Sequence, residues 1–88
     1  MASDLPTDEN HSITETERII AELWKEVLDT PELPSAGDNF FALGGDSTAM
    51  VMVEFRIKEE LAVDLPTGAI LRAPSLRELS ALVETWKP

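Results

Sequence analysis

The residues best suited to chemistry form the run Leu43-Gly44-Gly45-Asp46-Ser47. Two glycines allow the backbone to turn tightly into a helix, and Asp46 offers a carboxylate as an N-cap for the first-turn amides. Ser47 then stands at the exposed start of that helix, where free amides and the helix dipole favour a phosphate ester. The run therefore predicts an accessible hydroxyl suited to phosphorylation chemistry, although a plain turn followed by a cap has the same letters.

A catalytic role for Ser47 is disfavoured. A serine nucleophile needs a neighbouring base, but the single histidine, His11, lies near the N-terminus, and the pattern is Gly-x-Ser-x-Ala instead of Gly-x-Ser-x-Gly. Neither a phosphate-binding loop nor the Asp-x-Asp-x-Asp-Gly spacing of a calcium loop occurs. The absence of cysteine excludes thiolate metal sites and thiol catalysis. We expect no catalytic residue and no metal, so any thiol has to come from an added group.

Composition limits the partners. The 88 residues include 7 Lys and Arg against 17 Asp and Glu, a formal net charge of −10. A chain of this length forms at most one small domain, and its charge disfavours nucleic acid and anionic lipid. No apolar run approaches the roughly 20 residues of a membrane span, and no signal peptide is evident. We expect a soluble, cytoplasmic monomer that binds other proteins.

The domain is predicted to begin after a short leader. Residues 1–12 lack apolar periodicity and are predicted to be a flexible leader, which leaves residues 13–86 as the domain. A capping box at Thr14-Glu15-Thr16-Glu17 predicts the start of a first helix. Pro31 requires that helix to end before it, so residues 14–30 supply the first element of the bundle.

Three further helices are predicted after a long loop. Residues 30–46 contain too many Pro and Gly residues for a helix, but Phe40 and Phe41 predict that the loop's C-terminal half packs on the core. Residues 47–61 predict the second helix, residues 66–72 a short third one, and a capping box at Ser75 the fourth. The predicted fold class is therefore all-α, a small antiparallel four-helix bundle with three long helices and a short helix 3.

The second predicted helix has apolar residues on two sides. One side would face the bundle and consists of Ala49, Met50, Val53, Ile57 and Leu61. The other side, next to Ser47 and Thr48, contains an apolar strip of Val51, Met52 and Phe55, where a bundle helix ordinarily has charged residues. We predict that this strip is exposed and docks partner proteins. The alternative is that Met52 or Phe55 covers a neighbouring loop within the fold.

The longer run Asp38-Asn39-Phe40-Phe41-Ala42-Leu43-Gly44-Gly45-Asp46-Ser47 resembles the thiolation motif of peptidyl carrier proteins of nonribosomal peptide synthetases. The likeness continues through Arg56-Ile57, Val63-Asp64-Leu65-Pro66 and Ala73-Pro74-Ser75-Leu76, and covers about residues 14–85. It implies the acyl-carrier-protein-like bundle and a covalent 4'-phosphopantetheine on Ser47, taken from coenzyme A by a phosphopantetheinyl transferase. The terminal thiol of that group would hold an aminoacyl or peptidyl group as a thioester for natural-product biosynthesis.

The resemblance also implies partners and flanking site residues. Gly45, Asp46 and Thr48 would flank the attachment point. An adenylation enzyme and condensation, tailoring or thioesterase enzymes would bind the surface formed by Val51, Met52 and Phe55. Thr48 stands where the family usually has Leu or Ile, and Asp46 replaces the commoner His, which fits a free-standing carrier. Ala62 replaces a frequent Gly, so we expect a less sharp end to the second helix.

Two other functions stay open at this point. An acyl carrier of fatty-acid or polyketide type is favoured by the acidity and by Asp46-Ser47, and disfavoured by the run from Phe40 to Gly45. An unmodified helical interaction module would use Met52 and Phe55 to bind a partner, with Ser47 only structural.

Overall fold

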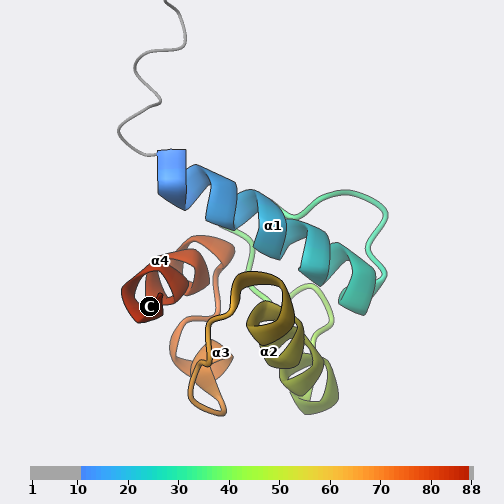
Figure 1. The fold of residues 1–88 in the computed structure, drawn as a ribbon. Helices are drawn as coiled ribbons and strands as arrows, with labels where there is room; N and C mark the ends of the chain where they lie inside the picture. The colour runs from blue at the N-terminus through green and yellow to red at the C-terminus, as the bar shows by residue number, and fades with distance from the viewer. Residues whose placement is uncertain (1–10, 88) are drawn as a thin grey trace, which may run out of the picture.

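The computed structural model describes residues 11–87, with side chains from Glu15 onward, and arranges them as a bundle of helices (Figure 1). The helices are α1 (His11–Leu28), α2 (Ser47–Leu61), α3 (Ala69–Arg72) and α4 (Leu76–Trp86). Residues 11–87 contain no strand, and one isolated bridge pairs Asn39 with Ser75. The predicted all-α fold, with three long helices, a short third helix and a long loop between the first two, is confirmed.

Helix α1 begins about one turn earlier than the capping box predicted. The sequence placed its start at Thr14, whereas the helix begins at His11. A capping signal is local, and residues 11–13 contain no Gly or Pro that would prevent the helix from extending upstream of Thr14. Of the leader predicted over residues 1–12, residues 1–10 lie outside the described residues, and the last two are helical. Thr14 and Thr16 are therefore interior residues of α1.

Thr16 connects α1 to α4. Its side chain is buried, and its hydroxyl donates a hydrogen bond to the Glu84 carboxylate. This hydrogen bond, with a second from Lys87, holds the pKa of Glu84 below its ordinary value. A carboxyl group with a lowered pKa stabilises the fold above the pKa of the unfolded chain, and this contribution is lost as the pH falls through the folded-state pKa. Acid therefore weakens the α1–α4 connection.

The core lies where α1 packs against α2 and α4 (Figure 1). Ile20, Leu23 and Trp24 recur at helical spacing on one side of α1 and are buried. Trp24 packs edge-to-face against Phe40, with ring centroids 5.1 Å apart. The rest of the buried apolar side chains are Ala21, Met50, Val53, Ile57, Val63, Leu65, Ala69, Ile70, Ala73, Leu76, Leu79 and Val83.

The loop between α1 and α2 is tied to the core through its C-terminal half. Phe40 is fully buried, and its amide donates a hydrogen bond to the Pro74 carbonyl at 2.8 Å. The Leu76 amide donates to the Asp38 carbonyl at 3.0 Å, so the loop is also joined to the start of α4. Phe41 packs edge-to-face on Phe40 at the surface. The order predicted for this half of the loop is confirmed, and the entry to α2 is fixed.

Helix α2 has its predicted bounds, residues 47–61. It ends at Ala62, which adopts the left-handed conformation with φ 59° and ψ 33°. The Ala62 amide donates to the Lys58 carbonyl at 3.0 Å. For a residue with a Cβ, this conformation is less stable by about 1–2 kcal/mol, because the Cβ lies too close to the following carbonyl oxygen. The helix end that glycine commonly provides is therefore formed by alanine.

The starts of α3 and α4 differ in how well the sequence predicted them. Helix α3 begins at Ala69 instead of Pro66, because Pro66 lies in a turn whose carbonyl accepts from the Ala69 amide at 3.1 Å. Helix α4 begins as predicted. The Ser75 hydroxyl accepts from the Glu78 amide at 3.1 Å, and the Glu78 carboxylate accepts from the Ser75 amide at 3.3 Å, which confirms the capping box.

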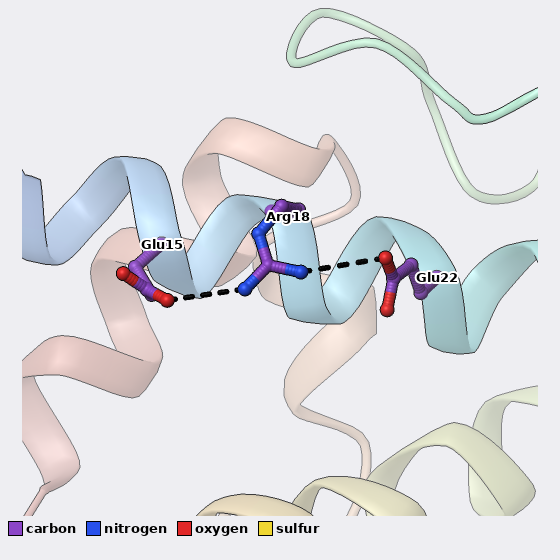
Figure 2. Close-up of polar contacts among 3 residues, drawn as sticks. All are labelled: Glu15, Arg18 and Glu22. Atoms are coloured by element: carbon purple, nitrogen blue, oxygen red, sulfur yellow. Dashed lines mark hydrogen bonds and ion pairs between the residues drawn. The ribbon is translucent and has the colours of Figure 1, made fainter.

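Ion pairs lie on the surface of the bundle. Arg18 pairs with Glu15 at 3.0 Å and with Glu22 at 3.4 Å along the outer face of α1 (Figure 2). Exposed pairs at this spacing contribute about 0.3–0.5 kcal/mol each. Between helices, Arg56 of α2 pairs with Glu26 of α1 at 2.9 Å, and this hydrogen bond raises the pKa of Arg56. These ion pairs add little to the stability of the fold compared with the burial of the apolar core.

Candidate functional site

Ser47 is the first residue of α2, and its side chain is exposed. It follows directly on the loop that Phe40 anchors in the core, so the start of the helix is fixed while the hydroxyl faces solvent. The exposure of Ser47 leaves its hydroxyl open to an approaching molecule.

The two glycines before Asp46 serve different physical needs. Gly44 has a φ of 101°, a backbone conformation that side chains rarely allow. A Cβ on Gly45 would lie 2.3 Å from the ring of Phe40 and 2.8 Å from its carbonyl oxygen. Gly44 is thus required by conformation and Gly45 by space, and together they bring the chain past Phe40 into α2.

Asp46 caps α2 and leaves the Ser47 region with free donors. Its backbone is extended, and its carboxylate accepts from the Ala49 amide at 2.9 Å. The amides of Ser47 and Thr48 have no hydrogen-bond partner among residues 11–87. These donors and the positive end of the helix dipole lie beside the Ser47 hydroxyl. The site therefore fits a phosphate ester on that hydroxyl.

Helix α2 has apolar side chains in two opposite environments. The buried face, defined here as Met50, Val53 and Ile57, is at most 7% exposed. The exposed strip, defined here as Val51, Met52 and Phe55, is between 51% and 58% exposed. Thr48, between Ser47 and this strip, is exposed as well. More than half of the surface of each strip residue is open to solvent, which disfavours the alternative that Met52 or Phe55 is buried against a neighbouring loop.

The sequence-predicted site residues lie on one continuous surface. Gly45 and Asp46 lead into α2, Ser47 and Thr48 are its first two residues, and the exposed strip follows them along the same helix. Leu71 of α3 was not predicted to be exposed, yet it is 64% exposed. Because α3 is a single short turn, the sequence offers no periodicity from which its exposed side could be found.

The described residues contain no cluster of three His, Cys, Asp or Glu side chains that could hold a metal ion. In the same part of the chain, no helix is long and apolar enough to cross a membrane.

Comparison with protein families and curated proteins gives matches that cover most of the chain. A family model described as the phosphopantetheine attachment site matches residues 18–83. Surfactin synthase subunit 3 of Bacillus subtilis (strain 168) is 40% identical over 70 residues, or 80% of this chain. The chain spans only 5% of that protein's length.

Solved structures of carrier proteins have a similar fold. BlmI, a type-II acyl-carrier-protein from Streptomyces verticillus involved in bleomycin biosynthesis, matches with a TM-score of 0.82 at 25% identity, over 91% of this chain and 95% of that one. A chain in the structure of the phosphopantetheine transferase Sfp in complex with coenzyme A and a peptidyl carrier protein matches with a TM-score of 0.74 at 30% identity. That match covers 80% of this chain and 90% of the other.

Proposed function

Because the chain belongs to the phosphopantetheine attachment site family, we propose that it is a peptidyl carrier protein modified on Ser47. It is a non-catalytic carrier that accepts 4'-phosphopantetheine from coenzyme A and presents an activated amino acid to partner enzymes in natural-product biosynthesis. The observation that carries the proposal is the exposed Ser47 hydroxyl at the start of α2. The proposed carrier is a monomer that acts in the cytoplasm.

The residues around Ser47 have distinct roles in this proposal. When attached, 4'-phosphopantetheine supplies the thiol that holds the amino acid as a thioester, in a chain that has no cysteine. Ser47 provides the attachment oxygen, and the amides of Ser47 and Thr48 are free to donate to the ester phosphate. Asp46 orders this turn by capping Ala49. The chain's own residues thus orient and hold the group.

The exposed strip is proposed as the surface on which the phosphopantetheinyl transferase docks. Val51 lies one helical turn from Ser47 and Phe55 lies two turns from it, so an enzyme that reaches the hydroxyl must cover this side of α2. The net charge of −10 favours a partner whose apolar contact is surrounded by basic residues. Adenylation, condensation, tailoring and thioesterase enzymes are proposed to use the same strip in turn.

Intact mass spectrometry tests the proposal. We expect the purified apo protein, incubated with coenzyme A and a promiscuous phosphopantetheinyl transferase, to gain the mass of one phosphopantetheine. Ser47→Ala should gain nothing, and Ser35→Ala, which removes an exposed hydroxyl from the α1–α2 loop, should be modified like wild type. No gain on wild type, or the same gain on Ser47→Ala, contradicts the proposed function.

A second candidate is an acyl carrier of fatty-acid or polyketide type, favoured by the close structural match to a type-II acyl-carrier-protein and by the acidity. Loading assays on the modified protein separate the two. A peptidyl carrier is loaded by an adenylation enzyme with an amino acid, whereas an acyl carrier accepts malonyl transfer.

A further inference from the structure

Glu54 of α2 reaches across to the start of α3. Its two carboxylate oxygens accept hydrogen bonds from the Gly68 amide at 3.3 Å and from the Ile70 amide at 3.5 Å. Gly68 is the N-cap residue of α3 and has no side chain with which to cap it. Glu54 therefore gives α3, from a neighbouring helix, the acceptor that Asp46 and Ser75 give to their own helices.

Helix α3 depends on such contacts for its position. It has only four residues, and Gly68 before it has a φ of 85°, so it has little stability of its own. Its inner side is held by burial of Ala69 and Ile70, while Leu71 is exposed to solvent. Where Leu71 lies on the surface is thus set by how α3 is fastened to α2, and Glu54 makes the polar part of that attachment.

Glu54 also lies next to the exposed strip. It follows Ser47 by seven residues, so it points about 20° away from Ser47 around the helix axis. A groove of about 210 Å³ lies beside it. Val51 and Phe55 line one side of this groove, and Leu65 and Thr67, in the segment that leads to α3, line the other. Glu54 thus stands between the strip and the chain that carries Leu71.

We propose that Glu54 is a positioning residue that holds α3 beside the exposed strip, so that a partner enzyme meets the strip and Leu71 as one surface. The role of that surface rests on the proposed function, whereas the hydrogen bonds from Gly68 and Ile70 do not. The partner is a phosphopantetheinyl transferase that makes apolar contacts on both sides of the groove.

Three variants test the proposal. Glu54→Ala removes both acceptor oxygens, and Glu54→Gln keeps one. Glu59→Ala is the matched control, since Glu59 is an exposed acid on the same helix that forms no ion pair or side-chain hydrogen bond among the described residues. The measurements are the amide proton resonances and hydrogen exchange of Gly68 and Ile70 by NMR, and the KM and kcat with which a transferase modifies each carrier.

In Glu54→Ala, we expect the Gly68 and Ile70 amide protons to shift upfield and to exchange about tenfold faster, because each loses a charged acceptor. The KM should rise about threefold or more with kcat nearly unchanged, because docking would have to order α3 first. Glu54→Gln should fall between wild type and Glu54→Ala. Glu59→Ala should leave both amides and the KM close to wild type.

Two results would overturn the proposal. If the Gly68 and Ile70 amides of Glu54→Ala keep their wild-type resonances, Glu54 does not hold α3. If those amides shift while the KM of Glu54→Ala equals that of Glu59→Ala, the attachment has no role in docking. Wild-type protein that is not modified at all would contradict the proposed function instead, and the NMR comparison of the apo variants would still test the attachment.

Discussion

The two faces of α2 are made of similar apolar side chains but have opposite surroundings. The buried face packs into the core beneath α1, whereas the exposed strip is more than half open to solvent. A helix on the surface of a small domain ordinarily has charged residues where this strip lies. The difference shows that only part of the apolar content of α2 serves folding. The exposed strip lies beside Ser47, where an approaching protein can bury it.

The largest effect on stability is expected on the buried face. Ile57→Ala removes a fully buried side chain and should lower the free energy of unfolding by about 2–5 kcal/mol, because it loses apolar burial and leaves a cavity. Such a loss is a large part of the roughly 5–15 kcal/mol that stabilises a typical domain. Urea denaturation followed by circular dichroism measures it. A loss below about 0.5 kcal/mol would contradict the assignment of this face to the core.

A smaller effect is expected at the start of α2, where the two faces meet. Asp46→Ala removes the acceptor of the Ala49 amide and should cost about 1 kcal/mol. Asp46→Asn is the matched control, because it keeps an oxygen at the same place without the charge. The same denaturation experiment compares them. If both variants were equally destabilised, the charge and not the cap would stabilise this turn.

The start of α2 could be predicted from sequence because its causes are local. Gly44, Gly45 and Asp46 act within the turn that they form, and the helix begins where they require it. The start of α1 was predicted wrongly because a Thr-x-x-Glu pattern can occur inside a helix as well as at its start, and the helix extends upstream of Thr14 to His11. The hydrogen bond from the Thr16 hydroxyl to Glu84, 68 positions away, is a tertiary contact that no capping pattern could predict.

The same reasoning explains what the sequence did not reveal around α3. In the sequence, Glu54 looks like any other acidic residue of a charged helix. Its role depends on hydrogen bonds from the amides of Gly68 and Ile70, which are 14 and 16 residues later in the chain. Leu71 lies exposed on a single short turn that begins at Ala69, after a turn at Pro66, and a helix this short has no periodicity that predicts its outer side. By contrast, the exposed strip could be predicted, since helical periodicity alone separates it from the buried face.

Substitutions in the exposed strip are expected to have the smallest effect on stability and the largest effect on recognition of the carrier by the transferase. Phe55→Glu and Val51→Glu put a charge where solvent already reaches, so the free energy of unfolding should change by at most about 0.5 kcal/mol. Modification of Ser47 by the transferase should nevertheless slow at least about tenfold, because the interface would bury an unpaired charge. The measurements are urea denaturation and the rate of phosphopantetheine gain by intact mass.

A matched control separates loss of docking from a general effect of added charge. Trp86→Glu makes the same kind of change at an exposed aromatic residue at the end of α4, a helix that lies apart from α2 in Figure 1. It should be modified at close to the wild-type rate. If Phe55→Glu unfolds the protein, the strip belongs to the core after all. If Phe55→Glu stays folded and is modified as fast as Trp86→Glu, the strip is not the surface that the transferase reads, and the contrast between the two faces of α2 has no functional meaning.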